Sequence, residues 1–216
     1  MKDIDTIIFD LGGVLIDWNP RYLYRKIFAT EDEVEWFLNN ICTSQWNDQQ
    51  DAGRSFDEAT QELIARYPAW EESIKAWYGR WQETIQGPIP GTVEILRSLK
   101  DSGSVRLFAL TNWSSETFPW ALRSFEFLQW FEGIVVSGHE HTRKPFPEFY
   151  KILFDRHGID PRRALFIDDN IKNIEGARAV GLHTIHFQDP AHLEKFLLSK
   201  GLLEKQSQGF STDSNR

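Results

Sequence analysis

The stretch Leu165-Phe166-Ile167-Asp168-Asp169-Asn170 decides the fold, because a short apolar run ends there in two adjacent carboxylates. The run 164–167 is typical of a buried strand. Two neighbouring carboxylates at its end repel each other, and a hard divalent cation such as Mg²⁺ relieves that repulsion. The alternative is that Asp168 or Asp169 caps the helix expected from Ile171.

Four other segments have the same short apolar character. They are residues 4–9, 105–110, 134–136 and 184–187. Amphipathic stretches lie between them, in which apolar residues recur at helical spacing, as at Val93, Leu96 and Leu99. Strands that alternate with helices predict an α/β fold, with a parallel sheet covered by helices on both faces.

Residues 18–86 break this alternation. They contain no strand-like run and are rich in Trp, Asp, Glu and Gln at helical spacings, which predicts an all-helical insertion after the first strand. We expect the Pro- and Gly-rich residues 87–91 to form a hinge back into the sheet domain. The core then comprises residues 1–17 and 87–201. The polar tail 202–216 has little to bury, so we expect it to be disordered.

The first strand leads into a candidate nucleophile. Phe9-Asp10-Leu11-Gly12-Gly13 places a carboxylate where the strand meets a glycine-rich turn. Parallel sheets bind ligands at the carboxyl ends of their strands, and the two glycines let the backbone approach a ligand closely. For an isolated Asp-x-Gly-Gly, a carboxylate that only caps the turn would be the favoured interpretation.

Two more elements offer groups that suit an anion. Thr111 and Asn112 follow the second strand of the core and can donate hydrogen bonds to phosphate oxygens, although such a pair is equally common as a helix cap or turn. Lys144 precedes Pro145 in a constrained segment and can present a fixed cation. Taken alone, it would be interpreted as a solvated lysine.

Together, and in this order, the four elements resemble the signature of the haloacid dehalogenase-like superfamily. The resemblance covers residues 4–187, and residues 18–86 resemble the small helical cap of that family. The most similar subgroup has F-D-L-G-x-V and D-D-N-x-x-N-I-E-G-A, here residues 9–14 and 168–177, and includes bacterial sugar-phosphate (glucose-1-phosphate) phosphatases. The resemblance implies a Rossmann-like core.

The resemblance also implies a reaction, which is Mg²⁺-dependent hydrolysis of a small phosphorylated metabolite, such as a sugar phosphate, through an aspartyl-phosphate on Asp10. Phosphoryl transfer needs in-line positioning and neutralisation of spreading negative charge. The groups implied to hold the phosphoryl oxygens are Thr111, Asn112 and Lys144. The groups implied to hold the metal ion are Asp10, the Gly12 carbonyl, Asp169 directly and Asp168 through a water.

One position departs from the family pattern. Phosphatases of this superfamily usually carry a second Asp two residues after the nucleophile, which protonates the leaving oxygen, and this chain has Gly12 there. General acid–base assistance contributes about 10²–10⁴ in rate, so a cap residue or a bound water would have to replace it. Asp17 is one candidate acid, although a domain-junction residue is the favoured interpretation of it. Within the insertion, Asp48, Asp51 and Arg54 lie in a polar turn. That turn resembles the family's substrate-specificity loop, but an ordinary solvated turn explains it equally well.

The tryptophans of the insertion have two interpretations. They could line a sugar-binding mouth, or they could fill a small helical core or a subunit contact. They are Trp36, Trp46, Trp70, Trp77 and Trp81. His139 and His141 are interpreted as loop residues, because no further ligand lies at metal spacing.

Two other functions stay open. The first is a 2-haloacid dehalogenase, in which the same Asp attacks carbon without a metal, although Asp168 and Asp169 speak against it. The second is a catalytically weak or silent relative that acts as a binding protein, which the glycine at position 12 favours. The retained Asp10, Lys144 and Asp169 argue for an enzyme.

Composition excludes some partners. The net charge is −8 and the basic residues are scattered, which argues against nucleic-acid binding. No apolar run approaches the roughly 20 residues of a membrane span. The acidic start lacks the pattern of a secretory signal, and the single cysteine, Cys42, suits a reducing compartment, so we expect a cytoplasmic protein. The oligomeric state cannot be inferred from the sequence.

Overall fold

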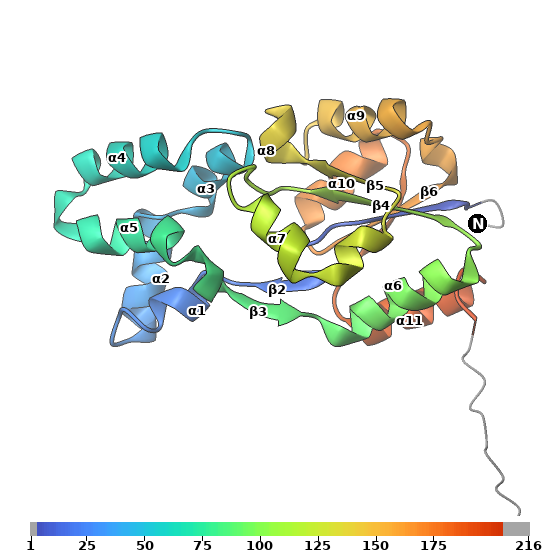
Figure 1. The fold of residues 1–216 in the computed structure, drawn as a ribbon, viewed down its shortest axis with the longest axis horizontal. Helices are drawn as coiled ribbons and strands as arrows, with labels where there is room; N and C mark the ends of the chain where they lie inside the picture. The colour runs from blue at the N-terminus through green and yellow to red at the C-terminus, as the bar shows by residue number, and fades with distance from the viewer. Residues whose placement is uncertain (1–3, 205–216) are drawn as a thin grey trace, which may run out of the picture.

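The centre of the computed structural model, which describes residues 4–204, is a five-stranded parallel sheet (Figure 1). The strand order is β5-β4-β1-β6-β7. The bounds are Thr6–Phe9 for β1, Arg106–Thr111 for β4, Gly133–Val136 for β5, Ala164–Asp168 for β6 and His183–His186 for β7. The predicted α/β fold is confirmed.

Helices cover both faces of this sheet, as the strands' alternating side chains require. In β1, Ile7 and Phe9 belong to one apolar core, while Ile8 belongs to the other. The first core packs against α6 (Pro90–Ser102), α7 (Phe118–Ser124), the 3₁₀ helix η3 (Glu126–Trp130) and α11 (Pro190–Ser199). The second packs against α9 (Pro147–His157) and α10 (Ile171–Ala179), while α8 (Ser137–Glu140) and η4 (Pro161–Arg163) are short connections.

The residues that follow β1 and precede α6 in sequence form a separate helical layer with its own apolar core, at the left of Figure 1. Tyr24 lies at its centre, with its ring 4.7 Å from that of Phe37 and 5.9 Å from that of Trp77. The helices are α1 (Arg21–Tyr24), α2 (Glu31–Asn40), α3 (Ser44–Asp51), α4 (Phe56–Arg66), η1 (Pro68–Trp70), α5 (Glu71–Gly79) and η2 (Trp81–Thr84). We refer to residues 18–86 as the helical insert.

The junction between insert and core differs from the prediction. Strands β2 (Ile16–Trp18) and β3 (Ile85–Pro88) form a two-stranded antiparallel sheet, so the insert is not wholly helical and residues 87–91 are not simply a hinge. The chain leaves and re-enters at adjacent points, where the two backbones satisfy each other's hydrogen bonds. Pro90 then begins α6, because the first helical position needs no N–H.

Three polar contacts hold the insert against the core. The Ser137 hydroxyl donates to the backbone oxygen of Asp51, and Arg143 Nη2 lies 2.9 Å from Asp48 Oδ2. The Phe56 N–H donates to Glu116 Oε1 at 2.7 Å. These contacts place α3 next to the carboxyl ends of the core strands.

The C-terminal boundary also differs from the prediction at its first residues. Leu202 and Leu203 pack against the core cluster that contains α11, so these two residues do not belong to a polar tail. The rest of the expected tail, residues 205–216, lies outside the described residues. Within residues 4–204, no helix combines the length and the apolar character that crossing a membrane demands.

Candidate active site

The register of the parallel sheet brings distant polar residues to one edge. Phe9 of β1 pairs with Ala109 of β4 on one side and with Ile167 of β6 on the other. Asp10 therefore follows β1 between the ends of β4 and β6. At those ends lie Thr111 and Asp168.

Lys144 is fully buried between two carboxylates. Its Nζ lies 2.8 Å from Asp10 Oδ1 and 2.7 Å from Asp168 Oδ2. The Asn112 side chain holds the backbone of this lysine, because Lys144 N donates to Asn112 Oδ1 at 2.9 Å and Asn112 Nδ2 donates to Lys144 O at 3.1 Å. The sequence suggested Asn112 as a phosphate donor, whereas its side chain positions Lys144.

Three carboxylates cluster around this lysine. Asp10, Asp168 and Asp169 each have an oxygen within 4.8 Å of the others. Asp168 is saturated by protein donors: Oδ1 accepts from Asn170 N at 2.7 Å, and both oxygens accept from Asn173 Nδ2 at 3.0–3.1 Å. The acceptor capacity left for a ligand therefore lies with Asp10 and with Asp169, the exposed member.

The cluster carries surplus negative charge. Burial raises the pKa of Asp10 well above its usual range, and Asp168 and Asp169 add to the rise while Lys144 opposes it. Burial and Asp168 also raise the pKa of Asp169. Burial would lower the pKa of Lys144, but Asp10 and Asp168 outweigh it and hold the pKa above its usual value. The lysine stays charged, and one positive charge faces three acids.

A divalent cation fits this donor set. Mg²⁺ prefers oxygen ligands and is commonly held by one or two carboxylates together with substrate phosphate. Gly13, with φ of +73°, lies directly against the Asp169 carboxylate, where any Cβ atom would collide with it. The turn after β1 thus leaves space for the acid of the neighbouring strand.

Thr111 adds a free donor at the same edge. Its Oγ1 is buried and has no hydrogen-bond partner among residues 4–204. A buried hydroxyl without a partner costs about 1–3 kcal/mol, so a ligand oxygen placed there would recover that cost.

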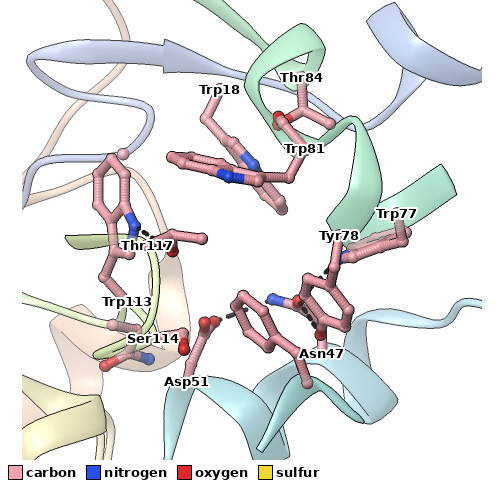
Figure 2. A pocket seen from close by; sticks show the side chains of 13 residues that line it. Trp18, Asn47, Asp51, Trp77, Tyr78, Trp81, Thr84, Trp113, Ser114 and Thr117 are labelled. Carbon is pink, nitrogen blue, oxygen red and sulfur yellow. Dashed lines mark hydrogen bonds between the residues drawn. The ribbon is translucent and has the colours of Figure 1, made fainter. Parts of the chain in front are cut away.

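A cavity joins this edge of the sheet to the insert (Figure 2). Its volume is about 90 Å³, and its wall includes Gly12 and Asn112 from the core and Asn47 and Asp51 from α3. Asp51 was suggested from the sequence as a loop residue near the substrate, and burial, together with Asp48, raises its pKa to about 7.

The other residues suggested near the substrate have partners away from the cavity wall. Arg54 Nε donates to Gln50 Oε1 at 2.8 Å and its Nη1 to Glu62 Oε2 at 2.7 Å, so its guanidinium is engaged within the insert and is not part of the cavity wall. Asp48 pairs with Arg143, and Asp17 accepts the Tyr22 hydroxyl at 3.0 Å. Local sequence could not show this, because each partner lies on another turn or element.

Two serines were missed. Ser137 is buried and accepts the Trp113 N–H at 2.9 Å while donating to the Asp51 backbone. Ser114 lines the cavity. Ser137 directly follows β5, so it lies at the carboxyl end of a parallel strand, as Asp10 and Thr111 do, and the same positional argument applies to it.

The parallel α/β fold, with a carboxylate directly after β1, a pair of acids at the end of β6 and a buried lysine between them, is that of a hydrolase of the Rossmann-like α/β class. The chain belongs to the haloacid dehalogenase-like hydrolase family, whose model matches residues 4–181.

Known relatives support this assignment. The sesquiterpene phosphatase astK of Aspergillus oryzae is 30% identical over 84% of this chain and 89% of its own. The glyceraldehyde 3-phosphate phosphatase of Pyrococcus furiosus is 23% identical, with 87% and 82% covered. Among solved structures, the family enzyme bt-2542 of Bacteroides thetaiotaomicron in complex with magnesium and inorganic phosphate has a TM-score of 0.64 and 24% identity, covering 88% of this chain and 98% of that one. At that identity the likeness shows the fold alone.

Proposed function

We propose that this protein is a Mg²⁺-dependent phosphomonoesterase that hydrolyses a small phosphorylated molecule through an aspartyl-phosphate on Asp10. The observation that carries the proposal is the position of Lys144 Nζ, 2.8 Å from Asp10, in a cluster that also contains Asp169. Such an arrangement presents a nucleophile and a fixed cation to one anionic group. The Aspergillus and Pyrococcus relatives are phosphatases by name, and the named substrates differ in the organic part.

The residues divide the reaction into two steps. A carboxylate oxygen of Asp10 attacks phosphorus, and the bond from phosphorus to the alcohol oxygen breaks. Water then attacks the aspartyl-phosphate, the bond from Asp10 to phosphorus breaks, and inorganic phosphate leaves. Lys144 and the Thr111 hydroxyl hold the phosphoryl oxygens throughout, while Asp168 and Asn112 keep Lys144 in place.

The metal-binding part of the proposal rests on the donor set. Asp10, Asp169 and the backbone carbonyl of Gly12 would hold Mg²⁺, with Asp168 behind them as the partner of Lys144. The bound ion would neutralise charge that spreads over the phosphoryl oxygens. The magnesium and phosphate in the Bacteroides relative agree with this choice of ion.

The test is phosphate release from p-nitrophenyl phosphate with Mg²⁺, with EDTA, and with Asp10→Asn. We expect release that needs the metal and is abolished by the substitution, while Asp155→Asn, an exposed carboxylate on α9, stays active. Metal-independent halide release from a 2-haloacid would instead indicate a dehalogenase. Inactivity in every assay would favour a binding protein.

A further inference from the structure

The cavity between insert and core is strongly aromatic. Six of the residues around it have aromatic rings, namely Trp18, Phe56, Trp77, Tyr78, Trp81 and Trp113. Figure 2 shows Trp18, Tyr78, Trp81 and Trp113 arranged around the space above Asp51. Among the lining residues, Asp51 alone is an acid and none is a lysine or arginine, so the wall has no cation for a second phosphate and no cluster of charged side chains for a polyol.

The polar side chains of this wall are largely occupied by one another. Asn47 Oδ1 accepts from Trp77 Nε1 at 3.2 Å and from the Tyr78 hydroxyl at 3.4 Å. Thr117 Oγ1 accepts from Trp113 Nε1 at 3.0 Å. These bonds turn the polar atoms toward each other and leave ring faces for a ligand.

Because the polar side chains of the wall are bonded to one another, they determine which kind of organic group binds favourably in the cavity. A sugar would leave hydrogen bonds to water and find few replacements, and each polar group left unpaired costs about 1–3 kcal/mol. A hydrocarbon group would gain about 0.8 kcal/mol for each buried CH₂. Because Gly12 and Asn112 belong to the same wall, a group in the cavity can be continuous with a phosphate at Asp10.

We propose that the cavity binds the organic part of a phosphate monoester whose alcohol is a hydrocarbon, aliphatic or aromatic, and that it disfavours sugar phosphates. The inference rests on the proposed function, because it places the phosphate at Asp10. The volume of about 90 Å³ is smaller than the roughly 150 Å³ of an engineered cavity that holds benzene, so the closed cavity suits only a compact group. Longer chains require the insert to move.

The test compares two phosphates of five-carbon primary alcohols, isopentyl phosphate and ribose 5-phosphate. We expect kcat/KM for isopentyl phosphate to be higher by about tenfold or more, because its CH₂ and CH₃ groups are buried. Trp81→Ala should lower that value about tenfold and should lower kcat/KM for acetyl phosphate much less, because the acetyl group buries little apolar surface. The matched control is Trp36→Ala, whose side chain is 48% exposed on α2 and outside the cavity wall.

A binding measurement separates this inference from the hydrolase proposal. Tryptophan fluorescence of the Asp10→Asn variant, titrated with each ester in Mg²⁺ buffer, reports affinity without turnover. Tighter binding of isopentyl phosphate supports the inference even if no ester is hydrolysed. Equal or tighter binding of ribose 5-phosphate overturns it, even if acetyl phosphate is hydrolysed through Asp10.

A second inference concerns the carboxyl group that the chain lacks at position 12. Asp51 ends α3 on the cavity wall, and Gly12 belongs to the same wall. Its Oδ2 accepts from Asn47 Nδ2 at 3.0 Å, and its backbone oxygen accepts from the Ser137 hydroxyl of the core. The residue is therefore held by both layers, its carboxyl group by the insert and its backbone by the core.

We infer that Asp51 gives a proton to the leaving alcohol and takes one from water. In the first step, the alcohol oxygen leaves phosphorus as Asp10 attacks, and it takes the proton of the Asp51 carboxyl group. In the second step, water transfers a proton to the Asp51 carboxylate as its oxygen attacks phosphorus and the bond to Asp10 breaks. The acid is thereby restored.

The surroundings of Asp51 suit both roles. Burial and Asp48 raise its pKa, whereas Arg143, the Ser114 N–H and Lys144 lower it, with a resulting value of about 7. The Tyr78 hydroxyl faces it from α5, and burial keeps that phenol neutral by raising its pKa. An acid–base group is most effective when its pKa lies near the working pH.

The test uses leaving groups of different basicity. Asp51→Asn should slow isopentyl phosphate hydrolysis by about 10²-fold or more, but p-nitrophenyl phosphate much less, because nitrophenolate leaves without a proton. The basic limb of the pH profile near neutrality should disappear. Asp57→Asn, an exposed residue of α4, is the control.

A rescue experiment excludes a merely structural role. A Cβ atom at Gly12 would meet nothing within 4 Å, so Gly12→Asp fits and puts a carboxyl group where related phosphatases have one. Added to Asp51→Asn, it should restore isopentyl phosphate hydrolysis. Equal losses on both esters, with the pH profile unchanged and no rescue, would show that Asp51 only supports the fold.

Discussion

At the scale of single residues, Lys144 has the most consequential environment. It is fully buried, and its Nζ bridges Asp10 and Asp168. A buried pair contributes little net stability, but removing one member leaves the other charge uncompensated. The lysine thus ties the integrity of the core to the arrangement of the acids.

Lys144→Met should therefore be both inactive and unstable. We expect the free energy of unfolding to fall by about 3–5 kcal/mol, because two buried carboxylates lose their counter-charge. Denaturant unfolding monitored by circular dichroism measures the loss. Adding Asp168→Asn should recover part of the stability but no activity, and failure to recover any would contradict the charge explanation.

The Asp51 carboxyl group lowers the stability of the folded protein in a way that depends on pH, whereas Lys144 supports the fold. Burial and Asp48 raise the pKa of Asp51 from the ordinary 3.8 to about 7 in the folded protein, so folding favours the protonated form. The native protein is therefore penalised increasingly as the pH rises from about 4 to 7, and the penalty is complete above that range. Asp51→Asn removes the charge and should raise the melting temperature at pH 8 more than at pH 5. An equal shift at both values would show that the carboxyl group titrates normally.

At the scale of elements, the contact of α3 with α8 determines how the insert covers the site. Ser137, at the start of α8, joins the Trp113 backbone of the core to the Asp51 backbone of the insert. These partners lie 24 and 86 residues away in sequence. One hydroxyl therefore connects the loop after β4, the first turn of α8 and the end of α3.

Ser137→Ala should loosen this contact. Loss of a buried hydroxyl that serves two partners should cost about 1–3 kcal/mol. We expect kcat/KM to fall severalfold while the melting temperature of the core changes little. Limited proteolysis of the loop between α3 and α4 reports whether the insert is displaced. Ser98→Ala on α6 removes a surface hydroxyl that bonds only its own helix and should change neither. Unchanged cleavage in Ser137→Ala would contradict the proposed coupling.

At the scale of the whole molecule, metal binding should link β1 to β6. Asp10 and Asp169 follow these two strands, and their mutual repulsion opposes folding when no cation is present. Any ligand that binds only the folded state stabilises it through mass action.

Mg²⁺ should therefore raise the melting temperature. At about 100 times its dissociation constant the gain is about 2.7 kcal/mol, or roughly 5–10 °C for a chain of this size. Scanning calorimetry with and without Mg²⁺, at matched ionic strength, measures it. Asp169→Asn should abolish the shift, and a shift retained in that variant would place the ion elsewhere.

The sequence by itself was sufficient to predict the parallel sheet, because five short apolar runs that alternate with helical patterns allow few other folds. It also predicted that Asp10, Thr111 and Asp168 meet, since parallel strands present their carboxyl ends at one edge. Family resemblance assigned roles to these residues, and those roles remain proposals.

Only the tertiary structure decided what depends on contacts between distant segments. The Asn112 side chain bonds the backbone of Lys144, the Arg54 guanidinium bonds Glu62, and β2 pairs with β3. The tertiary structure also enclosed Asp51 among aromatic rings, which changes the chemistry of a residue that looks like part of a solvated turn. The physical reason is that burial and charge at one residue are set by neighbours that local sequence patterns do not specify.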